Sequence, residues 1–283
     1  MKAGRVLGGG FARGAAQYGF LQGFLKTLKD VDINLISCSS IGVVNALALS
    51  YGIMDDIKDF YVESDFKSLK ILREALKKHY FHEMIDQITS SGSPKIRTYI
   101  TASCLNDLSA HYYLIEESTP TEQIKKLSDI TCTFPFVNGV IKKFEGKIYF
   151  DGGAFDNVPL YPMQYEEDLD IIFVFHCTRN YEPPANIIKS DVPILDINIT
   201  SLMPQKMETF SFQKENLSLM VEAGYQGGVE IAQKLQKELD EGKPLKEACQ
   251  NVINDNLKHG NKYDNHLMSS VEILNRAILS KYN

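Results

Sequence analysis

The stretch that most constrains the fold of this chain is residues 35–46, which predicts a strand, a sharp turn and a helix in immediate succession. A short, partly β-branched run at 34–36 leads into four small residues, and an apolar run rich in helix-forming residues follows at 43–49. This layout is typical of a nucleophile elbow, a strained turn that exposes a serine at the carboxyl edge of a sheet. An ordinary strand-to-helix turn made of small residues is the competing interpretation, and these residues alone do not separate the two.

Ser40 is the residue at the tip of such an elbow. The positions two before and two after the serine must be small because the turn is tight, and they hold Cys38 and Gly42. The usual pattern is G-x-S-x-G, so cysteine at the first of these positions keeps the small size but loses backbone freedom.

A second glycine-rich turn lies near the amino terminus. Residues 5–7 predict a short strand, Gly8–Gly10 a turn and 11–25 a helix, so N–H groups at the helix start form a nest for a phosphate or an oxyanion. The dinucleotide fingerprint G-x-G-x-x-G fails in both registers, no acidic residue ends the second strand, and the lysine of a P-loop is absent. An oxyanion hole beside Ser40 is the better interpretation, provided that the first two strands are adjacent and parallel.

Composition excludes several classes of protein. The chain has 283 residues, 44% of them hydrophobic, and its net charge of −6 argues against a nucleic-acid-binding protein. The five cysteines form no C-x-x-C pair, which excludes a zinc ribbon and indicates reduced thiols; Cys104, Cys132 and Cys177 lie in or beside apolar stretches and are interpreted as small buried side chains. The sequence shows no signal peptide and no apolar run of about 18 residues, so we expect a cytoplasmic protein that meets membranes only at a surface.

The rest of the pattern alternates strands with helices, which predicts one α/β domain spanning residues 1–283. A strand at 110–115 is expected to pair with one at 96–105, and a buried parallel strand at 171–175 ends at His176. The other expected strands lie at 140–144 and 147–150, as a hairpin, and at 192–199. Helices are expected at 41–51, 55–61, 67–81, 121–127, 213–239, 245–257 and 271–279.

The amphipathic segment 67–81 carries five basic residues and one acidic residue in an otherwise acidic chain. It is a candidate for a cap helix that faces a membrane, and the alternative is a solvated helix packed on the core. His79 and His82 are three residues apart, but no further ligand set accompanies them, so no metal site is assigned.

Three features follow one another along the chain: the glycine loop, the serine elbow and an Asp-Gly-Gly at 151–153. With them the sequence resembles the patatin-like phospholipases, over roughly the first 165 residues. Segment 9–14 matches that family's glycine-rich oxyanion loop, 38–42 its serine elbow, 130–135 its small-residue segment ending in proline, and 151–153 its catalytic aspartate motif. Residues 213–228 are similar to the carboxyl-terminal helix of bacterial members.

The resemblance implies a patatin-like three-layer α/β sandwich, in which a central, mostly parallel sheet is flanked by helices. The core motifs then fall within 5–165, and a helical carboxyl-terminal part occupies 207–283. It also implies a lipid acyl hydrolase, a phospholipase A-type esterase, that uses neither metal nor cofactor. The expected substrate is a lipid or another acyl ester, with a peripheral membrane surface as the contact and no nucleic acid. The oligomeric state does not follow from the sequence.

The resemblance implies a Ser–Asp dyad, with Ser40 as the nucleophile and Asp151 as the general base. We therefore expect the Asp151 carboxylate to lie within hydrogen-bond reach of Ser40 Oγ. Backbone N–H groups of Gly9, Gly10 and Phe11 would hold the oxyanion. Arg13, just inside the helix, is expected to orient the loop and not to touch the substrate. The remaining motif residues that support the site are Gly14, Cys38, Gly42, Gly152 and Gly153.

Three alternatives stay open. His176, at the carboxyl end of a strand, could complete a Ser–His–Asp triad in place of the dyad. Phe11 stands where the family has glycine, so a distorted loop would leave an impaired scaffold that binds a lipid or a partner protein. A nucleotide-binding α/β protein is the third alternative, already disfavoured by the failed glycine fingerprint.

Overall fold

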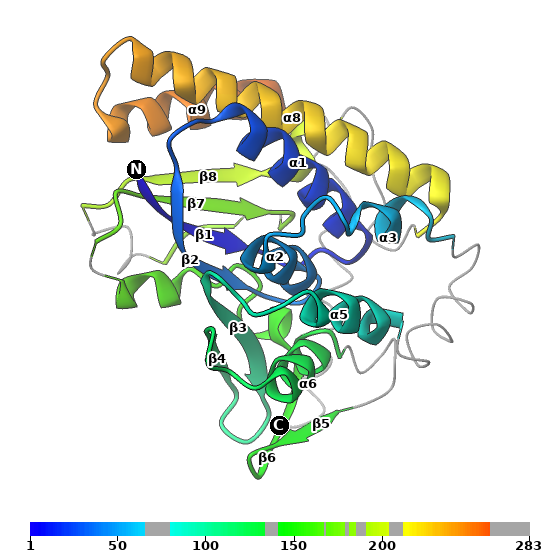
Figure 1. The fold of residues 1–283 in the computed structure, drawn as a ribbon. Coiled ribbons are helices and arrows are strands. Elements are labelled where there is room, and N and C mark those ends of the chain that lie inside the picture. The colour runs from blue at the N-terminus through cyan, green and yellow to red at the C-terminus, as the bar shows by residue number, and fades with distance from the viewer. Residues whose placement is uncertain are drawn as a thin grey trace.

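A central, mostly parallel sheet organises the computed structural model, which describes residues 1–65, 80–133, 141–166, 168–178, 181–184, 191–203 and 212–260 (Figure 1). Eight strands of this described part form it, in the order β5-β6-β3-β2-β1-β7-β8, with β4 paired to β3. Their bounds are β1 Lys2–Leu7, β2 Asp32–Cys38, β3 Arg97–Cys104, β4 Ser109–Ile115, β5 Lys142–Phe144, β6 Lys147–Asp151, β7 Ile171–His176 and β8 Ile194–Asn198.

The parallel part of the sheet positions both glycine-containing turns at one edge. β1 lies between β2 and β7 and pairs in parallel with both. On the outer sides, β2 pairs in parallel with β3, and β7 pairs in parallel with β8. Leu7 and Cys38 are register partners at the carboxyl ends of β1 and β2, so the turns that follow them start side by side. The expected adjacency of the first two strands is confirmed, and β4, β5 and β6 supply the antiparallel edge.

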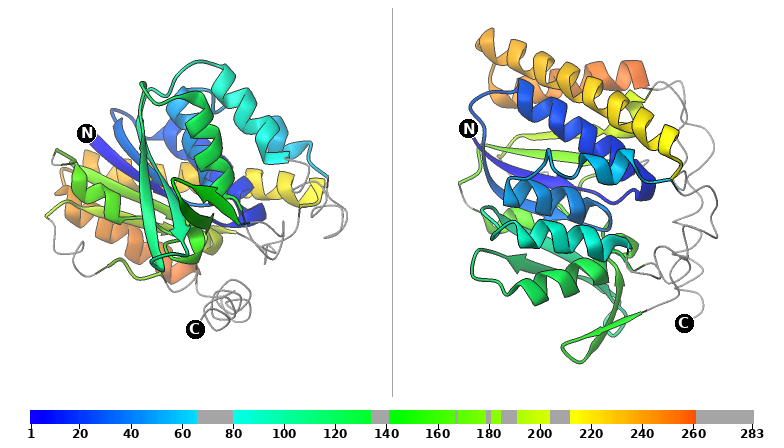
Figure 2. Two further views of the ribbon diagram at one scale, coloured as in Figure 1. Left: turned by 90° about the horizontal axis from the view of Figure 1, so that it is seen from below. Right: turned by 45° about the vertical axis from the view of Figure 1, so that its right-hand side comes forward.

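Helices cover one face of this sheet and share one large apolar core with it. Each of the following contributes buried side chains: α1 Gly14–Thr27, α2 Gly42–Tyr51, α3 Lys58–Val62, α5 Tyr80–Ser90, α6 Thr121–Thr131, α8 Lys214–Asp240 and α9 Leu245–Gly260. A smaller core on the other side of Val6 and Leu35 is closed by Val158, Leu160, Met163 and Leu169, and Met163 lies in the short 3₁₀ helix η3, Tyr161–Tyr165. The fold is thus the expected α/β sheet flanked by helices (Figure 2).

The longest of the described helices, α8, runs alongside α1 with the two backbones close together, as Figure 1 and the right view of Figure 2 show. Glycines make this approach fit: a Cβ added to Gly19 of α1 would lie 2.0 Å from Val221 O, and one on Gly228 of α8 would lie 2.2 Å from Phe20 O. Real Cβ atoms essentially never approach a backbone oxygen so closely. The carboxyl-terminal helical part is therefore fixed to the helix that begins at the glycine loop.

Most expected elements are confirmed, including the 110–115 pairing, the hairpin at 142–151, the buried strand at 171–176 and the helices at 214–240 and 245–260. The helix expected from Asp55 begins only at Lys58, because residues 54–57 form a turn in which Asp55 accepts a hydrogen bond from Gln22 (3.0 Å). The expected helices at 67–81 and 271–279 lie outside the described residues. Among the helices that are described, none has the length and apolarity needed to cross a bilayer.

Candidate active site

Ser40 lies at the tip of a strained turn between β2 and α2. Its φ is 52°, in the left-handed region that few non-glycine residues adopt. Gly42 must lack a side chain, since a Cβ there would lie 2.4 Å from Leu7 O. Cys38 is fully buried in β2 and keeps a negative φ, so glycine's freedom is not needed at that position. The turn has the backbone geometry of an elbow despite the cysteine.

Asp151 meets Ser40 at this edge of the sheet. It is the last residue of β6, where it pairs with Ala102 of β3. Ser40 Oγ donates a 2.8 Å hydrogen bond to Asp151 Oδ2, and the Gly153 N–H donates to Oδ1, also at 2.8 Å. The expected contact between the hydroxyl and the carboxylate is therefore confirmed, although their chemical roles remain predictions.

Burial sets the proton affinity of this carboxyl group. Asp151 is only 4% exposed, and the loss of water raises its pKa to about 7, against the opposing effect of the hydrogen bonds from Ser40 and Gly153. A carboxylate in water, with a pKa near 4, is a poor acceptor for a serine proton. Desolvation thus makes Asp151 a stronger base, with its pKa near neutral pH.

The end of α6 holds both partners in place. The Ser40 N–H donates to Thr131 Oγ1 (2.9 Å), and the Asp151 N–H donates to Thr133 O (2.8 Å). The helix reaches Thr131 instead of ending at residue 127, because Ile130 continues the buried apolar stripe of Ile124 and Leu127. The sequence marked 130–135 as a motif but assigned no contact to it, and the structure describes this segment only as far as Thr133.

The glycine loop touches the elbow directly. A Cβ on Gly9 would lie 2.7 Å from Ser40 Cβ, so glycine is needed for this approach. Asn157 fixes the loop: its carbonyl accepts the Gly9 N–H (3.1 Å) and its Nδ2 donates to Gly9 O (3.3 Å). The Gly9 N–H is thus already used, and the expectation that it supplies an oxyanion donor is corrected. Asn157 was not among the predicted site residues.

Gly10 and Phe11 follow with different backbone requirements. Gly10 is extended (φ −174°), whereas Phe11 adopts φ 52°, a conformation that costs a non-glycine residue about 1–2 kcal/mol. Within the described residues, neither the Gly10 N–H nor the Ile41 N–H has a hydrogen-bond acceptor. Ile41 directly follows Ser40, and Gly10 directly follows Gly9, the loop residue whose added Cβ would lie 2.7 Å from Ser40 Cβ.

A buried polar chain locks the glycine loop to α1 and α2. Gln17 Nε2 donates to Gly8 O (3.0 Å), and its Oε1 accepts from Asn45 Nδ2 (2.9 Å). Tyr61 OH completes the chain by donating to Asn45 Oδ1 (2.9 Å). Arg13, expected to orient the loop, donates from Nη1 to Cys177 O (3.4 Å). The sequence analysis missed Gln17 and Asn45. Their position on otherwise apolar helix faces was a detectable sign, because buried polar side chains need hydrogen-bond partners.

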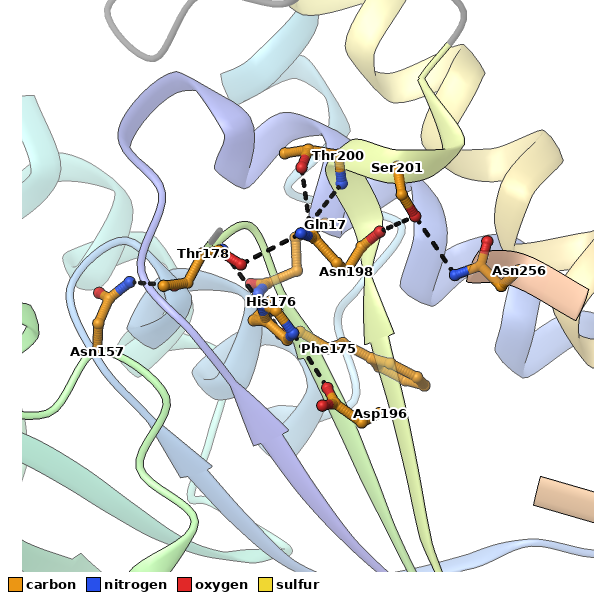
Figure 3. A network of polar contacts seen from close by, with 10 residues as sticks. All are labelled: Gln17, Asn157, Phe175, His176, Thr178, Asp196, Asn198, Thr200, Ser201 and Asn256. Atoms are coloured by element: carbon orange, nitrogen blue, oxygen red, sulfur yellow. Dashed lines mark hydrogen bonds and ion pairs between the residues drawn. The ribbon is translucent and has the colours of Figure 1, made fainter. Parts of the chain in front are cut away.

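His176 is engaged away from Ser40. Figure 3 shows its ring between Thr178 and Asp196: Nδ1 accepts the Thr178 N–H (3.1 Å) and Nε2 lies 3.0 Å from Asp196 Oδ1. Both ring nitrogens are used, and the Ser40 hydroxyl bonds Asp151. The structure therefore does not assemble the Ser–His–Asp triad that was the alternative to the dyad. Through Thr178, this group instead braces Asn157 (2.7 Å) (Figure 3).

Two thiols near the elbow are poor alternatives as nucleophiles. Burial raises the pKa of Cys38, whose Sγ lies 3.4 Å from Tyr99 O. Burial also raises the pKa of Cys132, and the charge of Asp151 adds to the shift. Because the thiolate is the reactive form, both side chains are chemically inert at neutral pH.

An apolar pocket opens beside the loop and the residue that follows Ser40. It is lined by Phe11, Ala12, Ile41, Phe60, Tyr61, Ser64, Phe212 and Leu217. Its wall joins the glycine loop, the elbow and the start of α8. The free space between these side chains is only about 10 Å³, roughly one water molecule, so a larger apolar group enters only if they move apart.

Comparison with known proteins gives matches in structure but none in sequence. No family model matches the chain, and no curated protein matches it in sequence. Among solved structures, "VipD from Legionella pneumophila" aligns over 99% of this chain and 85% of its own, with 12% identity and a TM-score of 0.41. A "type III effector protein ExoU" aligns over 100% of this chain and 70% of its own, with 13% identity and a TM-score of 0.35. Similarities this weak assign no function.

Proposed function

We propose that this chain is a patatin-like lipid acyl hydrolase, a phospholipase A-type serine esterase. The observation that carries the proposal is the 2.8 Å hydrogen bond from Ser40 Oγ to a buried Asp151, at a left-handed turn between a strand and a helix. A serine on such a turn projects at the carboxyl edge of the sheet, where a fixed acceptor can withdraw its proton. We also propose that the chain is a single domain, because strands from residue 2 to residue 198 share one sheet.

In the proposed reaction, Ser40 Oγ attacks the ester carbonyl carbon while its proton passes to Asp151 Oδ2. The bond to the alcohol breaks, and the alcohol leaves with that proton, which gives an acyl-Ser40 ester and an ionised carboxylate. Water then attacks the acyl group, Asp151 accepts its proton, and the proton returns to Ser40 as the acid departs. The raised pKa of Asp151 suits both directions of transfer.

The oxyanion of each tetrahedral intermediate would be held by backbone N–H groups of Gly10 and Phe11, with that of Ile41 from the elbow. Gly9 acts by allowing the close approach to Ser40 and by anchoring the loop to Asn157. One such donor is typically worth about two to three orders of magnitude in turnover.

The acyl chain would enter at the apolar pocket and widen it, because Ile41 in its wall directly follows the reacting serine. A lipid or other apolar acyl ester is the substrate that this pocket favours, with contact at a membrane surface. Phe11 then has a use: its side chain lines the pocket while its backbone is strained in the loop.

Labelling with a fluorophosphonate, followed by mass spectrometry of the peptides, tests the proposal. We expect a single adduct on Ser40, lost in Ser40→Ala and strongly slowed in Asp151→Asn. Ser39→Ala is the matched control, because within the described residues the Ser39 hydroxyl has no hydrogen-bond partner. Labelling elsewhere, or hydrolysis that survives Ser40→Ala, contradicts the proposal.

The catalytically impaired scaffold is the second candidate, favoured by the strained Phe11 and the engaged Gly9 N–H. The variants Phe11→Gly and Cys38→Gly distinguish the two. If the wild-type site is active, these substitutions should change turnover by less than about tenfold, which is under 1.4 kcal/mol in the barrier. An inert wild type that gains esterase activity with both glycines would instead identify a binding scaffold.

A further inference from the structure

A second cluster of reactive side chains lies at the hairpin between β3 and β4. The ligand atoms of Cys104, Asp107 and His111 all lie within 4.8 Å of one another. Cys104 is buried at the end of β3, Asp107 lies in the turn, and His111 projects from β4. We propose that these three side chains bind a zinc ion that staples the hairpin, a site separate from Ser40 and its chemistry.

The donor set matches zinc in kind and number. A thiolate, an imidazole nitrogen and a carboxylate oxygen are the three ligand types that zinc takes in proteins, and three protein ligands leave a fourth position for water. Bonds of about 2.0–2.3 Å to one tetrahedral ion place ligand atoms roughly 3.5 Å apart. His111 Nε2 and Asp107 Oδ2 are already 2.9 Å apart, so only small side-chain shifts are needed.

The second ring nitrogen of His111 is held as zinc ligands usually are. His111 Nδ1 lies 3.0 Å from Tyr149 OH, which also accepts a 2.6 Å hydrogen bond from Tyr113 OH. With a metal bound at Nε2, the ring proton would lie on Nδ1 and be donated to Tyr149 OH, and this bond would fix the orientation of the ring. Zinc ligands characteristically have such an outer partner, whereas a surface ion pair between histidine and aspartate does not require one.

A lysine beside the cluster competes with a metal for Asp107. Lys147 Nζ lies 3.1 Å from Asp107 Oδ2, and the Ser109 hydroxyl donates to Oδ1 (2.7 Å). The carboxylate that would bind the metal is therefore already held by two donors. The Lys147 side chain is 44% exposed and can turn into solvent, but while it stays it competes with the metal for Asp107.

Titration of the metal-free, reduced chain with Co²⁺ and then Zn²⁺ tests the site. We expect one Co²⁺ per chain with a thiolate-to-cobalt charge-transfer band, displaced by one equivalent of Zn²⁺. Cys104→Ser should abolish the band, and His111→Gln should weaken Zn²⁺ binding by tenfold or more. Lys147→Gln should tighten binding, because the competing ammonium is gone. Cys249→Ser, which removes a buried thiol of α9, is the matched control and should leave the titration unchanged.

Three results would overturn the site: no saturable binding by the wild type, a cobalt spectrum without a thiolate band, or a band that persists in Cys104→Ser. If Cys104→Ser does not fold, His111→Gln decides alone, since the His111 side chain is 24% exposed and lies outside the apolar core. Zn²⁺ should raise the melting temperature of the wild type and not that of His111→Gln. None of these measurements depends on esterase activity, so the proposed function and the metal site can fail separately.

Discussion

The pH dependence of ester hydrolysis follows from the burial of Asp151. The folded protein holds the pKa of this carboxyl at about 7, and only the ionised form accepts the Ser40 proton. Below pH 7, kcat/KM should therefore fall tenfold per pH unit, to about one hundredth of its plateau at pH 5. A solvent-exposed aspartate, with a pKa near 4, would leave the rate nearly constant over the same range. The two cases thus differ about a hundredfold at pH 5.

The assay uses a soluble short-chain ester, so that surface binding does not contribute, with product measured at a wavelength independent of pH. Circular dichroism at each pH verifies that the chain stays folded. Because kcat/KM reports the free enzyme, its midpoint should match Asp151 in the structure. Asp151→Asn should remove the activity at every pH, and Ser40→Ala combined with it should be no worse than either alone. A flat profile between pH 5 and 7 would refute burial of the base.

Three further outcomes concern stability, measured by urea unfolding. Asp151→Asn should raise the free energy of unfolding at pH 8 by up to about 4 kcal/mol. The wild-type fold loses stability between pH 4 and pH 7, because the carboxyl ionises near pH 4 in the unfolded chain but only near pH 7 in the folded one. At pH 4 the gain from the substitution should vanish. Gly228→Ala should cost several times more than Gly227→Ala, whose new Cβ meets only the flexible Leu202 side chain at 3.0 Å. Arg5→Met should stabilise by about 1 kcal/mol or more, since the buried guanidinium contacts two phenylalanine rings and has no hydrogen-bond partner within the described residues.

Much of the fold follows from local pattern. The strand–turn–helix around Ser40 and the hairpin ending at Asp151 are each encoded within a dozen residues, through size, periodicity and glycine placement. Their meeting depends on strand arrangement: β2 pairs with residues 97–100 of β3 and β6 with residues 102–104, both on the side of β3 that β4 leaves free. The sequence does not state that arrangement, and here the resemblance to a known family supplied it.

The residues that hold the site were not predicted, because each acts across the chain. Thr131 supports the Ser40 backbone from 91 residues away, and Asn157 anchors Gly9 from 148 residues away. A threonine at a helix end and an asparagine in a loop carry no local sign of such partners. The same limit explains the corrected role of Gly9, since a free N–H and an engaged one look alike in a sequence.

Phe11 shows how a departure from a motif is interpreted differently once packing is visible. In the sequence it is a bulky residue where backbone freedom is wanted, and the positive φ in the structure verifies that the strain exists. The same side chain forms part of the pocket wall, where burying apolar surface offsets a cost of about 1–2 kcal/mol. The loop is braced independently, through Gln17 at Gly8 and Asn157 at Gly9, so the strain stays at Phe11 and does not displace the residues beside Ser40. A strained pocket residue in a rigid loop is therefore compatible with a working oxyanion site.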